Sequence, residues 1–281
     1  MKKLLLLVFV AWNTVHAQQF NFDKRAADAL DKWVVFDKND SDTTYAFGFI
    51  YVDLQAGFTF NYETRLSVEN GKLKKQKKDD MSSLKYRLDV NARKVHILSD
   101  EQIKQLQLPN EPDWLAIYKS EKKDLSYLKN MGRHYNHIGA IDKSIPLLQK
   151  AYAEDPHFVG LEFELAYAYN ANGQFDQAIE ILNKAIKNDA QNFWFYRELG
   201  FSYIRKSDIE KAEEIYRKGI SISNDPQQKA EMAINMVQGY FMKKNRVKFD
   251  EWAHITRQYT PKGSQFDQFI DLFINKWNEK Q

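Results

Sequence analysis

The chain has 281 residues, of which 43% are hydrophobic, 28% charged and 14% aromatic. This composition is typical of a globular protein with room for one large or two ordinary domains. The net charge of +3 at pH 7 lacks the basic excess that binding to nucleic-acid phosphates requires. The chain contains no cysteine, which excludes disulfides, lipid-modified cysteines and cysteine nucleophiles.

Residues 1–17 predict a secretory signal peptide. Two lysines near the start are followed by an apolar run over residues 4–12 and by a small-residue cleavage pattern at 15–17, which are the three parts of such a peptide. The apolar run is too short to span a membrane. We expect a soluble, exported protein, periplasmic or secreted, that begins near Gln18 and has no spanning segment. A buried N-terminal helix is the alternative.

Residues 18–110 predict a small mixed domain, mainly an antiparallel sheet with one or two helices. Aromatic and β-branched residues are dense in the predicted strands. The expected elements are a helix at 22–33, a strand at 34–36, a hairpin of 45–52 with 58–62 that continues through 65–68 to a turn at Asn70-Gly71, a strand pair of 84–90 with 94–98, and a helix through Leu106 that starts with a capping box of Ser99 and Gln102.

Two polar loops of this domain have alternative interpretations. The loop from Asp37 to Asp42 alternates oxygen ligands in the manner of a calcium site, but its sixth position is Asp42 instead of glycine and its twelfth is Gly48 instead of glutamate. We therefore expect an acidic turn. The lysine-rich segment 72–80 predicts a solvated loop, with an anionic docking patch as the alternative.

Residues 111–124 predict a helix that leads into the second half of the chain. A polar, proline-containing joint at 110–113 precedes it, and Trp114, Leu115 and Tyr118 supply apolar side chains. We expect this helix to cover the open apolar end of the helices that follow.

The second half of the chain repeats a pattern of small, large and aromatic residues at an interval of 34 positions. Within each copy these residues recur at helical spacing in two groups, so each copy predicts two packed helices. Turn and cap residues separate the groups. The repeated positions are Met131, Leu165 and Leu199; Gly132, Ala166 and Gly200; Tyr135, Tyr169 and Tyr203; Ser144, Ala178 and Ala212; and Ala151, Ala185 and Gly219.

This 34-residue pattern resembles the tetratricopeptide repeat, and the whole chain resembles signal-peptide-bearing members of that family from Gram-negative bacteria. For the second half, the resemblance implies an all-α solenoid, so that with the predicted sheet domain before it the chain is of the α+β class. The solenoid would consist of four repeats at 125–158, 159–192, 193–226 and, after a three-residue insertion, 230–263, followed by a capping helix at 264–281.

By the same resemblance, one face of each first helix lines a concave groove that holds a protein or peptide segment. This face combines aromatic residues with arginines, which suit partner side chains and acidic groups. The alternative is that the N-terminal domain or the packing of repeats buries several of these residues. The predicted groove residues are Lys129, Arg133, Asn136, Phe163, Tyr167, Asn170, Trp194, Arg197, Phe201, Arg205, Gln238 and Phe241.

The clamp by which some family members hold a C-terminal carboxylate is not reproduced, because Trp194 and Glu198 replace its basic positions in the third copy. His134 and His137 are a close histidine pair, but a zinc site needs more convergent ligands than they offer. The sequence has no phosphate-cradling glycine loop and no Gly-x-Ser-x-Gly elbow. We therefore predict no catalytic residue, no metal and no cofactor.

These observations favour a non-enzymatic scaffold or adaptor of the cell envelope that binds a protein partner and no nucleic acid. One alternative is an enzyme or small-ligand binder with its site in the sheet domain, near Tyr45, Tyr51, Tyr62 or the 37–42 loop. Another is a purely structural array whose groove is filled by the N-terminal domain of the same chain.

Overall fold

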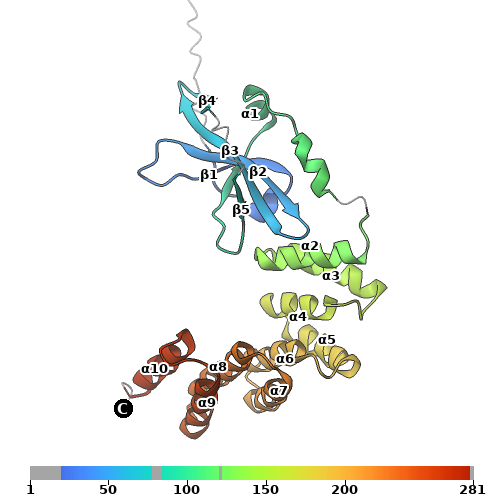
Figure 1. The fold of residues 1–281 in the computed structure, drawn as a ribbon, viewed down its shortest axis with the longest axis vertical. Helices are drawn as coiled ribbons and strands as arrows, with labels where there is room; N and C mark the ends of the chain where they lie inside the picture. Colours follow the sequence, from blue (N-terminus) through green and yellow to red (C-terminus); the bar gives the residue numbers. More distant parts are fainter. Residues whose placement is uncertain (1–19, 78–83, 120–121, 279–281) are drawn as a thin grey trace, which may run out of the picture. The chain divides into compact units, whose positions relative to one another are not determined.

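The computed structural model describes residues 20–77, 84–119 and 122–278, and Figure 1 shows its backbone. The chain divides into two compact units, which we call the sheet unit (Met1–Lys119) and the helical unit (Ser120–Gln281). An antiparallel sheet followed by paired helices confirms the predicted α+β class. The predicted signal peptide lies outside the described residues.

The sheet unit is built on one antiparallel sheet with the strand order β4-β3-β2-β1-β6, and β5 also pairs with β3. Its centre is the predicted hairpin, in which residues 45–53 pair with 57–66. Asn70 and Gly71 have φ angles of 51° and 75°, as a tight hairpin turn requires, and they connect β3 to β4. The strands are β1 (Lys32–Phe36), β2 (Tyr45–Asp53), β3 (Gly57–Glu69), β4 (Lys72–Lys75), β5 (Lys85–Arg87) and β6 (Val95–Ile97).

Short helices cover one face of this sheet. Trp33, Phe47 and Phe49 form its aromatic centre, with Trp33 lying 5.3 Å from Phe47 and 5.1 Å from Phe49 between ring centroids. Leu106 and Leu115 pack into the same core from the helical segments. These segments are η1 (Ala26–Ala29), η2 (Asp113–Tyr118) and α1 (Asp100–Gln105), and α1 starts with the predicted capping box.

The predicted strand pair of 84–90 with 94–98 is wrong. β5 pairs with β3, whereas β6 pairs with β1, so the two segments join different strands of the sheet. A turn does form between them, where the Ala92 amide donates to the Asp89 carbonyl. Alternation of apolar and polar residues marks a strand but does not identify its partner. In the lysine-rich segment 72–80, the first four residues form β4 instead of a loop, and residues 78–80 lie outside the described part.

The helix predicted at 22–33 is also wrong over most of its length. Four residues of it form the 3₁₀-helix η1, and Trp33 belongs to β1. The Trp33 indole is buried in the sheet core and donates a hydrogen bond to the Pro109 carbonyl at 2.8 Å. Burial of this large ring against the sheet overrides the local helical spacing.

The segment predicted as a lead-in helix for the repeats belongs to the core of the sheet unit. It forms η2, in which Leu115 is buried. Trp114 lies 5.9 Å from Phe49 and 5.1 Å from Tyr51 between ring centroids. These aromatic contacts explain why the segment is part of the sheet core.

The helical unit consists of four helix pairs and one further helix over residues 125–278 (Figure 1). Each pair is joined by a short turn, and successive pairs pack against each other. The first helices of the pairs are α2 (Leu125–His137), α4 (Leu161–Ala171), α6 (Phe193–Arg205) and α8 (Pro226–Met242). The second helices are α3 (Ile141–Glu154), α5 (Phe175–Asn188), α7 (Ile209–Ile222) and α9 (Arg246–Tyr259), and α10 (Gln265–Asn278) follows.

Small residues on the first helices leave space for large side chains of the second helices. A Cβ atom on Gly200 would lie 2.4 Å from the ring of Tyr216, and one on Gly132 would lie 2.5 Å from Leu148. This close approach explains the repeated glycine or alanine register, because a larger residue there would separate the paired helices. At the C-terminal end, Ile270 of α10 is buried against α8 and α9, as the predicted capping helix requires.

Candidate partner-binding groove

The first helices α4, α6 and α8 line two adjoining pockets, which together we call the groove. The pockets have volumes of ≈ 270 and ≈ 560 Å³ and share Phe201 and Asn235. The smaller is lined by Tyr167, Asn170, Ala171, Arg197, Glu198, Phe201, Glu231 and Asn235. The larger is lined by Phe201, Ile204, Arg205, Ser207, Ile209, Asn235, Gln238, Gly239, Met242 and Lys243.

A buried hydrogen-bond network holds α4 to α6 beneath the smaller pocket. The Asn170 Nδ2 group donates to both the carbonyl and the carboxylate Oε2 of Glu198, each at 3.1 Å. The Ser202 hydroxyl lies 2.7 Å from Asn170 Oδ1, which accepts from it, and 2.9 Å from the Glu198 carbonyl. Every polar atom of the Asn170 amide therefore has a partner, which fixes the position of the Glu198 carboxylate at the floor of the groove.

The same arrangement recurs one repeat earlier, between α2 and α4, but it is incomplete. Asn136 Nδ2 donates to the Glu164 carbonyl at 3.0 Å and to Glu164 Oε2 at 2.9 Å. The position that corresponds to Ser202 is Ala168, which has no hydroxyl. Asn136 Oδ1 is consequently buried without a hydrogen-bond partner, a state that disfavours the fold.

Arg197 is held firmly between α6 and the neighbouring helices. Its guanidinium bonds Glu198 Oε1 at 2.9 Å and Gln228 Oε1 at 2.9 Å, and it lies 3.6 Å from a carboxylate oxygen of Glu231. The same group lies 4.5 Å from the centroid of the Trp194 ring and 5.6 Å from that of Phe163. Its charge is therefore already neutralised, so Arg197 shapes the groove wall instead of offering a free cation.

Arg205 differs from Arg197 in its partners. Its side chain is exposed and lies 5.6 Å from the ring centroid of Phe175 and 5.9 Å from that of Phe201. Within the described ranges it makes no ion pair with a carboxylate. Met242, 74% exposed, lines the same pocket. This end of the groove thus presents an unneutralised cation beside an apolar surface.

Half of the predicted groove residues line the groove, and the other half do not. Those that line it are Tyr167, Asn170, Arg197, Phe201, Arg205 and Gln238. Phe163 and Trp194 flank Arg197, and Asn136 joins α2 to α4. Lys129 and Arg133 lie on α2 and oppose the effect of burial, which raises the pKa of the nearby Glu164 carboxyl. Phe241 packs against Phe273 and Trp277 of α10 and lines neither pocket.

Two residues of α8 that line the smaller pocket, Glu231 and Asn235, were missed from the sequence. They precede Gln238 by seven and three positions, so helical spacing places all three on one face. The prediction for α8 included only Gln238 and Phe241, although helical spacing from Gln238 points to both residues.

The sequence predicted neither a metal site nor a membrane-spanning segment. In these ranges, no group of three or more histidine, aspartate or glutamate residues is placed to hold a metal ion. His134 is buried, whereas its predicted companion His137 is exposed. No helix in the described part of the chain is long and apolar enough to cross a bilayer.

Comparison with protein families gives a match to the tetratricopeptide repeat at residues 139–194 and 171–233. The helical unit carries tetratricopeptide repeats. The matched region includes α4 and α6 and most of the groove, and proteins with these repeats typically mediate protein–protein interactions. No curated protein matches the chain.

Several solved structures are similar to the tetratricopeptide part of the chain. TTC0263, a thermophilic TPR protein of Thermus thermophilus, has 16% identity and a TM-score of 0.47, covering 54% of this chain and 82% of its own. MamA (MSR-1) has 16% identity and a TM-score of 0.42, covering 52% of this chain and 84% of its own. Similarity at this level carries no information on the partner or activity of this chain.

Proposed function

We propose that this chain is a non-enzymatic adaptor that holds a segment of a partner protein in the groove. The observation that supports this most is the end of the groove at α6 and α8, where Arg205 has no described carboxylate partner and Met242 is largely exposed. A cation and an apolar side chain that are left unpaired on one concave surface suit a ligand that supplies both complements.

The chemistry of the groove specifies the kind of segment it would hold. An acidic side chain of the partner would pair with Arg205, and an apolar or aromatic side chain would pack on Phe201 and Met242. Asn235 and Gln238 offer amide groups for the backbone of the segment. The groove therefore favours an extended peptide that alternates acidic and apolar residues.

The site of action that we propose is the cell envelope or the exterior of a Gram-negative cell. This part of the proposal rests on the signal-peptide pattern of residues 1–17. Fractionation of cells that express the chain, with sequencing of the N-terminus of the exported protein, tests it. A mature N-terminus near Gln18 in the periplasm or medium is expected, and an uncleaved cytoplasmic protein would contradict it.

A quantitative pull-down with two charge-reversal variants tests the groove. Arg205→Glu reverses the free cation of the groove, whereas Lys218→Glu makes the same charge change at an exposed position of α7 that lines neither pocket. We expect partner recovery to fall about tenfold or more with Arg205→Glu and to be unchanged with Lys218→Glu. Equal recovery with both variants would remove the groove from the proposal.

A second function, binding of a small ligand by the sheet unit, is favoured by one observation. A cavity of ≈ 480 Å³ lies against the loop after β1, where the sequence suggested an alternative site. Its volume is within the range of small-molecule sites.

A further inference from the structure

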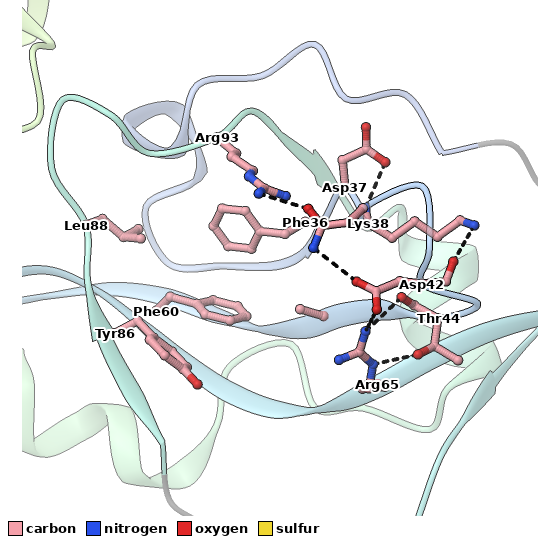
Figure 2. Close-up of a pocket in the computed structure, with 12 residues that line it drawn as sticks. Phe36, Asp37, Lys38, Asp42, Thr44, Phe60, Arg65, Tyr86, Leu88 and Arg93 are labelled. Carbon is pink, nitrogen blue, oxygen red and sulfur yellow. Dashed lines mark hydrogen bonds and ion pairs between the residues drawn. The ribbon is translucent and has the colours of Figure 1, made fainter.

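The cavity of the sheet unit, shown in Figure 2, combines an apolar wall with a polar rim. Phe36 and Phe60 meet edge to face with ring centroids 4.8 Å apart, and Tyr86 lies 6.3 Å from Phe60. Leu88 completes this wall, and Ala46 lines the cavity with a side chain of one carbon. The wall is therefore apolar and mainly aromatic, which suits the ring of an aromatic ligand.

The rim is a string of hydrogen bonds and one ion pair that ties the 37–44 loop to the sheet (Figure 2). Arg93 donates to Asn39 Oδ1 at 3.1 Å, Asn39 Nδ2 donates to Asp42 Oδ2 at 3.4 Å, and Asp42 Oδ1 lies 3.5 Å from a guanidinium nitrogen of Arg65. Arg65 also donates to the Thr44 hydroxyl at 2.5 Å. These contacts hold the rim in place beside the aromatic wall without a ligand.

Two cations of the cavity lining have no carboxylate partner among the described residues. The Arg93 guanidinium bonds the neutral amide of Asn39. The Lys38 ammonium bonds the backbone carbonyl of Asp42 at 2.7 Å and lies 5.6 Å from the centroid of the Tyr45 ring. By contrast, Arg65 is paired with Asp42. With Asp37 and Asp42 also in the lining, the three cations exceed the carboxylates by one, so the cavity has one spare positive charge for an anion.

Tyr86 is exposed over 51% of its surface although it lies at the aromatic wall. Tyr86 lies on β5, and Leu88 directly follows this strand. Both line the cavity, whereas Arg87 between them does not. This alternation follows from the strand geometry, which points successive side chains to opposite faces. Tyr86 is the cross-strand partner of Phe60 and therefore lies beside it, with much of its surface free for a ligand.

We propose that this cavity binds a small aromatic carboxylate, with the ring against Phe36, Phe60 and Tyr86 and the carboxylate at Arg93. The fixed rim and the aromatic wall supply the position of the ring, and the unneutralised guanidinium supplies the recognition of the anion. This inference is independent of the groove, because it concerns the sheet unit alone, and either can fail without the other.

Two probes of the same shape separate recognition of the anion from burial of the ring. The full chain is titrated with 2-naphthoate and with the neutral 2-naphthylmethanol, and ¹H–¹⁵N correlation spectra report binding and the integrity of the fold. We expect saturable binding of 2-naphthoate, with a dissociation constant on the order of 1 mM or tighter. 2-Naphthylmethanol is expected to bind about tenfold more weakly. Equal affinity for both probes, or no saturation by 2-naphthoate, would overturn the proposal.

Two arginine variants localise the site. Arg93→Gln removes the guanidinium of the rim, and Arg87→Gln removes the same charge from an exposed position that does not line the cavity. We expect 2-naphthoate to bind about tenfold more weakly to the Arg93 variant and with unchanged affinity to the Arg87 variant. If both variants weaken binding equally, general surface charge and not this cavity holds the probe, and the proposal is wrong.

Discussion

Two successive interfaces between first helices of the repeats, which we call joints, are built in different ways. The joint of α4 with α6 contains the buried polar network of Asn170, Glu198 and Ser202. At the joint of α6 with α8, the corresponding residues are Ile204, 34 positions after Asn170, and, after the three-residue insertion, Asn235 and Gly239. Ile204 packs against the apolar cluster around α8, and Asn235 donates to the Tyr216 hydroxyl at 3.1 Å instead of joining α6 to α8. One set of positions thus accepts either a polar or an apolar solution.

The difference teaches how the groove acquires its polar floor. Each polar atom of the Asn170 amide has a hydrogen-bond partner. The network can therefore hold the Glu198 carboxylate beside the groove at little cost in stability. The joint of α6 with α8 has no such network, and the ionic contacts of this part of the array lie between α7, α8 and α9, around Glu213, which bonds Lys248, Tyr240 and Arg217. The residues at these positions can therefore differ in polarity, and so change the chemistry of the groove, while the repeats still pack against each other.

The largest expected effect is at the apolar joint. Met232 is fully buried and packs where Gly219 leaves space. Met232→Ala should lower the free energy of unfolding by about 2–5 kcal/mol, because the surrounding helices cannot fill the cavity completely. Chemical denaturation measures this value. A loss below about 1 kcal/mol would mean that the joint is not held by apolar packing.

Removal of the asparagine should distinguish the complete polar joint from the incomplete one. Asn170→Ala leaves Glu198 and Ser202 without their buried partner and should cost about 1–3 kcal/mol. Asn136→Ala should cost less, because it also removes an oxygen that already lacks a partner. Denaturant titration of both variants provides the comparison. Equal losses would show that the missing hydroxyl at Ala168 has no energetic consequence.

The ionic contacts of Glu213 should give the packing of α7 against α8 and α9 a dependence on acid pH. Although burial alone would raise the pKa of Glu213, hydrogen bonds from Lys248, Tyr240 and Arg217 lower it to about 2, against 4.5 for an ordinary glutamate. Since the folded-state pKa is depressed, the contribution to stability is fully present above about pH 4.5 and is lost as the pH falls to about 2.

Glu213→Gln tests this dependence. We expect the variant to be less stable than the wild type by about 1–2 kcal/mol at pH 7, after allowance for solvent screening. The difference should shrink strongly at about pH 2.5, where the wild-type carboxylate approaches protonation. Denaturation at the two pH values measures it, and the same difference at both would contradict the assignment.

The smallest expected effects come from exchanging one hydroxyl between the two polar joints. Ala168→Ser would supply the hydroxyl that Asn136 Oδ1 lacks and should raise the free energy of unfolding by about 1 kcal/mol. Ser202→Ala removes the equivalent hydroxyl from Asn170 and should lower it by about the same amount. Thermal or chemical denaturation measures the change in the free energy of unfolding of each variant. Changes of opposite sign support the comparison, whereas a loss of stability in both variants would count against it.

The helical unit was predicted well because its contacts are between neighbouring segments at a constant interval. The positions of Gly132, Gly200 and the capping helix follow from periodicity alone. The polar joints were not predicted, although Asn136 and Asn170, like Glu164 and Glu198, recur at the same 34-residue interval. Their pairing depends on contacts between helices, which a search for apolar faces does not register.

The sheet unit was predicted less well because its pairings connect distant parts of the chain. The hairpin of β2 with β3 has a local turn and was found, whereas the partners of β5 and β6 lie far away in sequence. Phe241 shows the same limit in the helical unit. Its helical spacing is that of a groove residue, but its ring packs against Phe273 and Trp277 of α10, which lies later in the chain.

Site-specific photo-crosslinking tests the central claim, that the groove holds a partner segment, most directly. A photoreactive residue is placed in cells at Gln238, which lines the groove, or at Lys218, an exposed position of α7 that lines neither pocket. We predict an adduct with one partner from position 238 that disappears when Arg205→Glu is added, and no such adduct from position 218. The same adduct from both positions, or one from 238 that persists with Arg205→Glu, would contradict the account.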